Sequence, residues 1–430
     1  MLRLIASDPG FAAAFGAMVD DRRESDAGVA RDVTAIIADV RARGDAALSE
    51  YTTRFDRFTP ATDADWRIDA TTCREAYDAL TPDLRAALEL AAQRIRAYHA
   101  AQLPENRDYT DDQGLRLGAI WRGVDAAGLY VPGGRAAYPS SLLMNAIPAK
   151  VAGVARLVIA TPTPDGEINP LVLAAAHLAG VDEIWRIGGA QAIAALAYGT
   201  DRIAPVDVIT GPGNAWVAEA KRQLYGVVGI DMVAGPSEIL VIADAQNDPQ
   251  WIAADLLSQA EHDPAAQSIL ITDDAAFADA VIAAIDSEIA LLPKAQIARA
   301  SWDRYGTVII VGSLDEAPAL ANRIAAEHVE IATDDPETCF AQIRHAGSAF
   351  LGRHSPEAIG DYVAGPNHVL PTGRRARFSS GLSVLDFMKR TSFIAVSDEA
   401  LHAIGPAAIQ LANAEGLTAH ARSIELRLGI

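Results

Sequence analysis

Gln259 and His262 stand three positions apart in the segment DPQWIAADLLSQAEH (248–262). Residues i and i+3 share one face of an α-helix, so both side chains point the same way if this segment is helical, while Glu261 points elsewhere. Two ligand-type residues from one helical turn are a common start to a metal site. A solvated polar patch has the same spacing, so this pair alone leaves both interpretations open.

Glu327 and His328 are adjacent where a helical pattern meets the strand pattern HVEIA (328–332). Neighbouring side chains of a regular strand face opposite ways, so joint action requires an irregular join between the two elements. A carboxylate beside an imidazole is a workable base pair near neutral pH, because histidine titrates near ~6.5. A helix cap or a salt-bridged pair would have the same sequence.

Two glycine-rich segments, Gly188–Gln191 and Gly211–Asn214, each follow a predicted strand, and Val131–Gly134 precedes them in the chain. Open parallel sheets bind ligands beyond the carboxyl ends of their strands. Glycine lets a backbone approach a ligand closely, and free N–H groups at a helix start favour an anion such as a pyrophosphate. Neither of the first two segments matches GxGxxG, so tight turns and a nucleotide site both remain open.

His368 lies in the Gly/Pro-rich loop AGPNHVLPTG (364–373), which follows the helical segment that contains Asp361. Loops of this kind are places where functional side chains are held. Near the C-terminus, Glu415 and His420 are five positions apart with Gly416 between them, which gives no clean helical face. Spacing therefore indicates scattered ligand-type residues and stops short of a mechanism.

The elements that must position these residues change character along the chain. Residues 1–114 are predicted to be mainly helical. From residue 115, short β-branched segments alternate with Ala-rich helical segments, which indicates βαβ units, parallel sheets and right-handed crossovers. The predicted strands cover 156–161, 183–187, 206–210, 238–243, 268–272, 307–311 and 328–332.

We expect an α/β protein with two Rossmann-like parallel-sheet domains. The first covers 115–236 and carries the glycine-rich segments, and the second covers 237–380 and carries the metal-type and acid–base residues. A helical N-terminal region (1–114) and a helical C-terminal tail (381–430) complete the expected organisation.

The composition narrows the class of protein. The 430 residues include 36 Lys plus Arg and 56 Asp plus Glu, a formal net charge of -20 that disfavours nucleic acid and anionic lipid as partners. No apolar stretch approaches the ~20 residues that span a bilayer, and the N-terminus lacks a signal-peptide pattern. Two cysteines, Cys73 and Cys339, fit a reducing compartment. We expect a soluble, cytoplasmic protein.

Several long segments occur in a fixed order along the chain: GLYVPGGRAAYPSSLLMNAIPAKVAGV, RIGGAQAIAALAYGT, GPGNAWVAEAKRQ, IDMVAGPSEILVIAD, DLLSQAEHD, EHVEI, GDYVAGPNHVLPT and SGLSVLDFMKRTS. These segments resemble the signatures of the histidinol dehydrogenase family. The similarity runs over nearly the whole length and is densest from 115 to 393. A series of long signatures in order is far more specific than one glycine-rich segment.

The resemblance implies a zinc-dependent oxidoreductase that converts L-histidinol through L-histidinal to L-histidine, the last steps of histidine biosynthesis, and reduces two NAD. It implies that the acid–base pair is Glu327 and His328. The implied ligands of one zinc ion per subunit are Gln259, His262, Asp361 and His420. The implied NAD contacts are Tyr130, Gln191 and Asn214. The implied substrate contacts are Ser237, Gln259, His262, His328, Asp361, Glu415 and His420.

The resemblance also implies a homodimer with a shared active site, in which the C-terminal helices cross to the other subunit and His420 acts there. A catalytic part for His368 is a second-rank expectation. One departure from the family pattern is Ala326, where we expect a proline. This change would affect the geometry of the join before the acid–base pair and leave the assigned roles intact.

The implied zinc is mainly a template that fixes the substrate. His328 then takes the alcohol proton, and Glu327 activates water for hydration of the aldehyde. Many other aldehyde oxidations proceed through a thiohemiacetal, which needs an activated thiolate. Cys73 and Cys339 lie in helical segments away from the glycine-rich loops, so we expect no covalent thioester.

Two alternatives remain open. A paralogue of the same family could oxidise another amino or sulfonated alcohol, although Glu415 and His420 beside the Glu–His pair favour histidinol. A zinc hydrolase with Glu327 as general base is a different class. It predicts activity without nicotinamide and leaves the glycine-rich segments unexplained.

Overall fold

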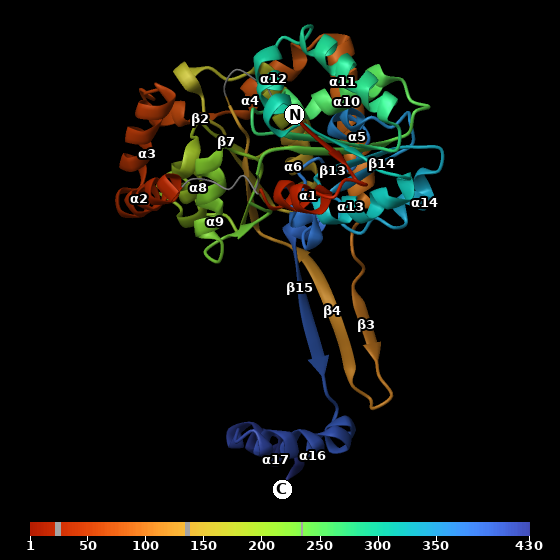
Figure 1. Ribbon diagram of the computed structural model, residues 1–430. Coiled ribbons are helices and arrows are strands. Elements are labelled where there is room, and N and C mark those ends of the chain that lie inside the picture. The colour runs from red at the N-terminus through yellow and green to blue at the C-terminus, as the bar shows by residue number, and fades with distance from the viewer. Residues whose placement is uncertain (22–26, 134–137, 234) are drawn as a thin grey trace.

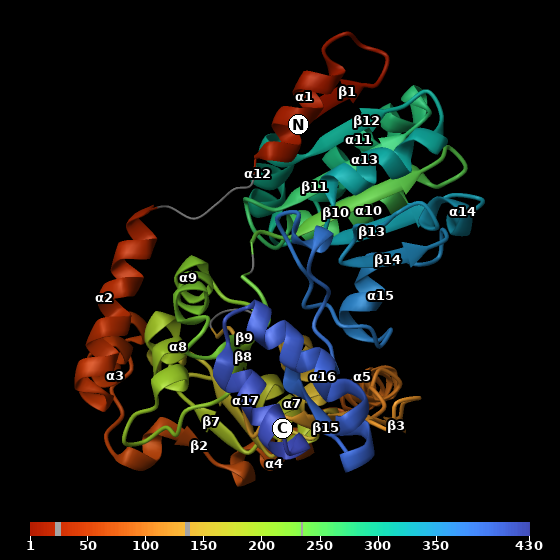
Figure 2. The same cartoon turned by 90° about the horizontal axis from the view of Figure 1, so that it is seen from below.

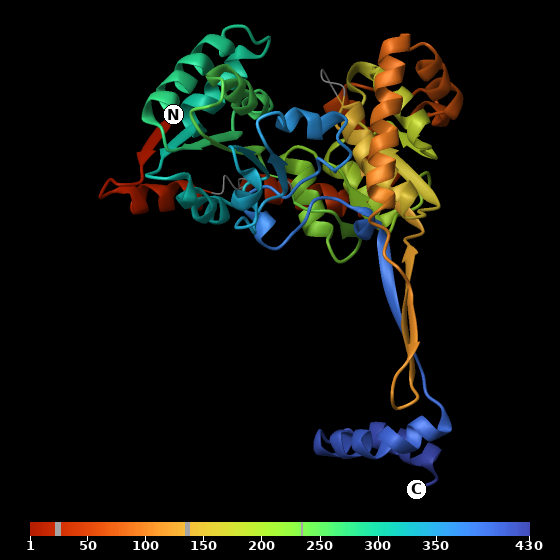
Figure 3. The same cartoon turned by 90° about the vertical axis from the view of Figure 1, so that its right-hand side faces the viewer.

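Two α/β lobes face each other, and a narrow arm projects from them (Figure 1, Figure 3). This computed structural model describes residues 1–21, 27–133, 138–233 and 235–430. Gly134, the last residue of one predicted glycine-rich segment, lies outside the described residues. No helix among the described residues is both long enough and apolar enough to cross a membrane.

The first lobe is built around a six-stranded sheet in which all neighbours except β2 and β7 run parallel. In sheet order its strands are β2 (Arg67–Ile68), β7 (Glu183–Trp185), β6 (Arg156–Ala160), β5 (Ala126–Tyr130), β8 (Val208–Thr210) and β9 (Gly229–Ile230). All five residues of β5 are buried, because helices cover both faces of the sheet.

These helices form two layers. One layer comprises α4 (Ala70–Asp78), α5 (Pro82–Ala100), α6 (Pro139–Val151) and α7 (Pro170–Ala179). The other comprises α2 (Ala27–Arg43), α3 (Asp45–Tyr51), α8 (Gly189–Tyr198) and α9 (Ala215–Leu224), which Figure 2 shows together on one side of the lobe. Side chains of β5 alternate between the two layers, with Leu129 facing the first and Tyr130 the second.

The second lobe contains a six-stranded, fully parallel sheet. In sheet order its strands are β1 (Leu2–Ile5), β12 (Thr307–Ile310), β11 (Gln267–Thr272), β10 (Glu238–Ala243), β13 (His328–Ala332) and β14 (Ser348–Leu351). One face packs against α10 (Pro249–Ala260), α11 (Ala275–Ile289) and α12 (Ala295–Tyr305). The other packs against α1 (Phe11–Asp20) and α13 (Ala317–Ile324). The short helices α14 (Pro336–Phe340) and α15 (Glu357–Tyr362) complete the lobe.

The two sheets share one topology. From β5 the chain first builds outward through β6 and β7, and then returns to add β8 and β9 on the other side of β5. From β10 the second lobe repeats this path through β11 and β12 and then β13 and β14. The strand order therefore reverses between β5 and β8 and between β10 and β13, and such switch points leave a crevice for a ligand. The expected pair of Rossmann-like sheets is confirmed.

The arm consists of an antiparallel sheet of β3 (Arg107–Thr110), β4 (Arg116–Gly123) and β15 (Met388–Ala395). At its tip α16 (Asp398–Ala414) packs against α17 (Thr418–Leu428), well away from both lobes (Figure 1, Figure 3). Large apolar side chains on this arm are exposed in the single chain, including Ile394, Leu411 and Leu426.

Four strands lie in segments whose sequence predicted helix. β1, β2 and β3 occur within residues 1–114, and β15 occurs within 381–430. Each is short or exposed along most of its length, so none carries a periodic apolar pattern. β1 pairs with β12 across about 300 positions of sequence, a contact that no local pattern reports.

Candidate active site

A cavity of about 650 Å³ lies between the two lobes. The first lobe contributes segments that follow its strands, including Pro132 after β5 and Gly211–Asn214 after β8. The second lobe contributes residues at the starts of its strands, including Ser237 before β10 and His328 in β13. The cavity therefore joins the carboxyl edge of one sheet to the amino edge of the other, each at its switch point.

Most of the residues singled out in the sequence meet at this cavity. Those that line it are Asn214, Ser237, Gln259, His262, Glu327, His328, Asp361 and His368. In the described part of the chain, the cavity wall includes neither Tyr130 nor Gln191, both of which are buried. Glu415 and His420 belong to the exposed helices at the tip of the arm and do not reach the cavity of their own chain.

Gln259 and His262 are held by the end of α10. The helix stops at Ala260, and His262 lies in the turn that follows, where its backbone N–H donates to the Gln259 carbonyl at 3.1 Å. Glu261 occupies the C-cap position between them and is also part of the cavity wall.

The irregular join required before the acid–base pair is present. α13 ends at Ile324, its C-cap residue Ala325 is left-handed at φ +51°, and strand β13 begins only at His328. Glu327 Oε2 accepts a hydrogen bond from the Glu238 N–H at 3.0 Å, and His328 Nδ1 lies 3.0 Å from the Glu238 carbonyl oxygen. Both side chains are thus anchored to one residue of the neighbouring strand, Glu238, through the peptide groups on its two sides, with Nδ1 and Oε2 3.8 Å apart.

This anchoring fixes the tautomer of His328. A carbonyl oxygen only accepts, so Nδ1 carries the proton and Nε2 keeps its lone pair. Nε2 has no hydrogen-bond partner among the described residues and lies 3.6 Å from Glu357 Oε1. Burial lowers the pKa of His328 to about 4, so the imidazole is neutral and able to accept a proton at neutral pH.

Burial has the opposite effect on Glu327. It raises the pKa of this carboxyl well above its ordinary value, while the hydrogen bond from the Glu238 N–H acts against that shift. A carboxyl of this kind can gain and lose a proton at a higher pH than an exposed glutamate. Two neighbouring groups with displaced pKa values, one raised and one lowered, are typical of acid–base sites.

Glu357 was not predicted from the sequence. It lies on α15, is almost fully buried, and its Oε2 accepts a hydrogen bond from Ser258 Oγ at 2.8 Å. Burial, followed by the negative charge of Asp361, raises the pKa of Glu357 to about 8. The sequence does contain a signal, since Glu357 and Asp361 are four positions apart and share one helical face.

Asp361 is the centre of the metal-type ligands. Ligand atoms of His328, Glu357 and Asp361 all lie within 4.8 Å of one another, and the free Nε2 and Oε1 atoms of the first two belong to this cluster. Burial alone would raise the pKa of Asp361, but the hydrogen bond and charge of His368 outweigh it and hold the pKa below its usual range. Asp361 is therefore an anion facing the cavity.

The predicted ligand set fits a zinc ion by its chemistry. His262 is exposed in the single chain, and desolvation by the surrounding cavity wall lowers the pKa of its imidazole, which favours the neutral form that binds a metal through nitrogen. Gln259 is buried and supplies an amide oxygen, and Asp361 supplies a carboxylate. Zinc takes nitrogen and oxygen donors of these types, and three protein ligands leave a position open.

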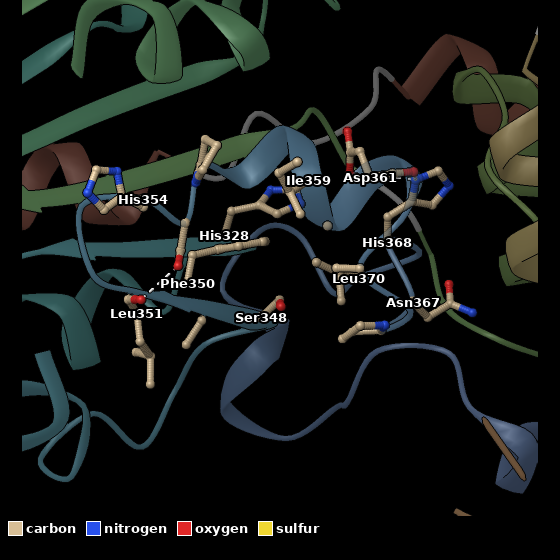
Figure 4. Close-up of a pocket in the computed structure, with 16 residues that line it drawn as sticks. His328, Ser348, Phe350, Leu351, His354, Ile359, Asp361, Asn367, His368 and Leu370 are labelled. Carbon is tan, nitrogen blue, oxygen red and sulfur yellow. Dashed lines mark hydrogen bonds and ion pairs between the residues drawn. The ribbon is translucent and has the colours of Figure 1, made fainter. Parts of the chain in front are cut away.

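His368 supports Asp361 from the following loop. Its Nδ1 donates to the Asp361 carbonyl at 3.1 Å and lies 3.6 Å from Asp361 Oδ1. Figure 4 shows both residues in a second cavity of about 240 Å³, which also includes His328. The walls of the two cavities share these three residues and Leu370.

The glycine-rich segments of the first lobe pack tightly around Tyr130. The Tyr130 hydroxyl accepts a hydrogen bond from the Gly189 N–H at 3.1 Å, and a Cβ on Gly211 would lie 2.2 Å from the Tyr130 carbonyl oxygen. Gly211 has φ +111°, a conformation that strongly favours glycine. Asn214 caps α9 by accepting from the N–H groups of Trp216 and Val217, each at 3.1 Å.

The two cysteines lie elsewhere. In the part of the chain that the structure describes, neither Cys73 nor Cys339 is in the cavity wall. Burial raises the pKa of both thiols to about 11, so neither forms a thiolate readily at neutral pH.

Comparisons with known proteins agree over the whole chain. A model of the histidinol dehydrogenase family matches residues 19–428. Histidinol dehydrogenase of Zymomonas mobilis is 61% identical over 428 residues, covering 100% of this chain and 99% of the relative. That of Ruegeria pomeroyi is 63% identical over 425 residues, covering 99% of this chain and 98% of the relative.

A solved structure gives the same result for the fold. The crystal structure of histidinol dehydrogenase from Elizabethkingia anophelis superposes with a TM-score of 0.94 at 34% identity, covering 100% of this chain and 98% of that chain. The family predicted from the ordered signature segments is thereby confirmed. This chain belongs to the histidinol dehydrogenase family.

Proposed function

We propose that this protein oxidises L-histidinol through L-histidinal to L-histidine with two NAD, as the last two steps of histidine biosynthesis. Besides family membership, one observation in the structure supports this proposal. The cavity between the lobes brings an acid–base pair and zinc-type ligands from the second lobe against the glycine-rich segment Gly211–Asn214 of the first.

His328 is proposed to take the hydroxyl proton of histidinol in the first oxidation. The hydrogen bond from Nδ1 to the Glu238 carbonyl orients the ring and leaves the lone pair of Nε2 without a hydrogen-bond partner among the described residues. Because the imidazole is neutral at neutral pH, it can act as a base without first losing a proton.

Glu327 is proposed to activate the water that hydrates histidinal. Its carboxyl is buried beside His328 and is fixed by the Glu238 N–H. The hydrate then carries a new hydroxyl, and His328 can take the proton of that hydroxyl in the second oxidation. This route needs no cysteine, in keeping with the high pKa values of both thiols.

Gln259, His262 and Asp361 are proposed to hold one zinc ion per subunit. When bound, that ion would supply a template for the imidazole and amine of the substrate. Ser237 lies in the same cavity wall and is proposed to contact the substrate. The hydrogen bonds of His368 hold Asp361 in place.

The first lobe is proposed to bind NAD through Tyr130, Gln191 and Asn214. Bound NAD would supply the acceptor for the hydride in each oxidation. The N-terminal ends of α8 and α9 carry the positive end of the helix dipole, which suits a pyrophosphate. Tyr130 supports the first of these segments by accepting from the Gly189 N–H.

The C-terminal tail is proposed to complete the cavity of a second copy in a homodimer. Glu415 and His420 lie at the tip of an arm that leads away from their own lobes, so they can contact a substrate only in another subunit. The exposed Ile394, Leu411 and Leu426 support this arrangement, since apolar side chains on a projecting arm are suited to contact with a partner.

The test is the amount of NADH formed per histidinol consumed, before and after removal of metal with a chelator. The proposal predicts a ratio near two, loss of activity on chelation and recovery with Zn²⁺. Activity on small diols or sulfonated alcohols in preference to histidinol would instead assign the chain to a paralogue with another substrate.

A further inference from the structure

A buried ion pair in the first lobe holds one residue of a glycine-rich segment at both of its peptide groups. Lys221 of α9 pairs with Asp231, which directly follows β9, and the two side chains are only 2% and 1% exposed. Lys221 Nζ also donates to the Gly211 carbonyl at 3.0 Å. On the other side, the Gly211 N–H donates to Asp231 Oδ2 at 2.9 Å.

The Lys221–Asp231 ion pair, which we call the clamp, holds Gly211 where the backbone of the segment is tightly constrained. Gly211 adopts φ +111° and passes so close to Tyr130 that a Cβ would overlap the carbonyl oxygen at the end of β5. Three positions later, Asn214 begins α9, the helix that carries Lys221. Through Lys221, the ion pair ties Gly211 to helix α9, which follows the segment. Through Asp231, it ties Gly211 to the residue that follows strand β9.

Stability alone does not explain such a pair. Removing two charges from water is costly, and apolar residues of similar volume often serve as well or better for folding. Lys221, Asp231, Gly211 and Asn214 all line the cavity between the lobes, so the clamp sets the shape of a wall that a ligand would meet.

We propose that Lys221 and Asp231 are positioning residues for NAD. They hold the Gly211–Asn214 segment in the conformation that accepts the cofactor, without chemistry of their own. This inference rests on the proposed function, because it requires that NAD binds at this segment.

The experiment measures the dissociation constant of NAD by calorimetry on the full-length, zinc-loaded protein. Lys221→Met is expected to weaken NAD binding about tenfold or more, because a displaced binding loop forfeits contacts. The KM for NAD should rise by a similar factor, while kcat and the KM for histidinol stay within about threefold.

Arg222→Met is the matched control. Arg222 is the next residue of α9 and also forms an ion pair, with Glu219, but its side chain is 57% exposed and touches no glycine-rich segment in the described structure. NAD binding by this variant should equal that of the wild type.

A double variant separates positioning from folding. Lys221→Met combined with Asp231→Leu leaves no unpaired buried charge, so its melting temperature should recover relative to Lys221→Met alone. NAD affinity should stay reduced, because the Gly211 peptide groups remain unheld. Recovery of NAD affinity in the double variant, or unchanged affinity in folded Lys221→Met, would overturn the inference.

The NAD titrations distinguish failure of the proposed function from failure of the positioning role. If the wild type does not bind NAD, the proposed function itself is wrong. If the wild type binds NAD and Lys221→Met binds it equally well, only the role given to the ion pair is wrong.

Discussion

The Nδ1 atom of His328 lies 3.0 Å from the carbonyl oxygen of Glu238, and their hydrogen bond joins the first residues of strands β13 and β10. These strands are neighbours at the point where the strand order of the second sheet reverses. The bond therefore fixes His328, the proposed base, at a switch point on the amino edge of that sheet. The facing lobe uses its carboxyl edge, so the two similar sheets bring different chemistry to one cavity.

His328→Asn tests the base. An asparagine amide can reproduce the Nδ1 hydrogen bond to the Glu238 carbonyl, while it removes Nε2. We expect kcat for histidinol oxidation to fall by roughly 10²–10⁴, the usual contribution of a positioned base. Steady-state rates with NAD in excess measure this, and a melting temperature close to that of the wild type would show that the fold is kept. Near-normal turnover would exclude His328 as the base.

Glu327→Gln tests the water-activating carboxyl. The amide can no longer act as a base, so we expect NADH per histidinol to fall from two toward one and oxidation of added histidinal to be lost. If Glu327→Gln oxidised histidinal at the wild-type rate, hydration would have to depend on another group.

The pH dependence of the second oxidation follows from the same residue. Burial raises the pKa of Glu327, and only its ionised form can activate water, so the rate with histidinal should increase as pH rises through that raised pKa. His328 stays neutral over this range because its pKa is about 4. Stopped-flow rates from pH 6 to pH 9 would check the rise, and a rate that falls with pH would contradict it.

The sequence predicted which side chains share a helix or a turn. It did not show which segments, distant in the chain, meet at one site. The spacing of Gln259 and His262 placed both residues at the end of one helix, and both line the cavity, although the helix ends before the histidine. That they bind a metal stays a prediction. Their approach to Asp361 depends on packing between α10 and α15, which no spacing reveals. Glu357 could have been found from its position four residues before Asp361. The family resemblance, and not periodicity, supplied the link between these segments.

The sequence also could not reveal which sheet edges form the cavity. Of the glycine-rich segments that follow strands, Gly211–Asn214 does line the cavity at the carboxyl edge of the first sheet, whereas Gly188–Gln191 is not part of its described wall. The same rule gave no reason to expect Ser237 and His328 at the amino edge of the second sheet. That arrangement depends on the orientation of one lobe relative to the other, which is a property of the tertiary structure.

A double variant, Cys73→Ala with Cys339→Ala, tests the absence of a thioester. Both thiols lie outside the described cavity wall, and burial raises the pKa of each to about 11. We expect both oxidations to continue within about twofold of the wild-type rate, since neither sulfur meets the conditions for a reactive thiolate. Loss of the second oxidation alone, in a folded variant, would point to a covalent route.

Because of Glu330, we expect the free energy of unfolding to decrease as pH rises. Burial, followed by the charge and hydrogen bond of Asp255, raises the pKa of Glu330 to about 10. At pH values between the ordinary pKa of a glutamate and this raised pKa, Glu330 is protonated in the folded chain and ionised in the unfolded chain. This stabilisation is complete below the unfolded pKa and is lost as pH rises, at up to about 1.4 kcal/mol per pH unit.

Glu330→Gln removes this proton and its pH dependence. The melting temperature of the variant relative to the wild type should therefore increase from pH 6 to pH 9. Glu337→Gln is the control, because Glu337 is exposed and its substitution should give a nearly constant difference. A Glu330→Gln difference that stays flat with pH would show that Glu330 is already ionised in the folded protein.

Mixing two inactive variants tests the shared active site. A His420→Asn chain has intact lobes and a defective tail, whereas a His328→Asn chain has defective lobes and an intact tail. If tails act in the other subunit, a mixed dimer contains one site built entirely from unchanged residues. Co-refolding or co-expression at equal amounts should then restore about a quarter of wild-type activity, because half of the dimers are mixed and each has one working site. If each tail served its own chain, no mixed dimer would contain a complete site, and the mixture would stay as inactive as its components.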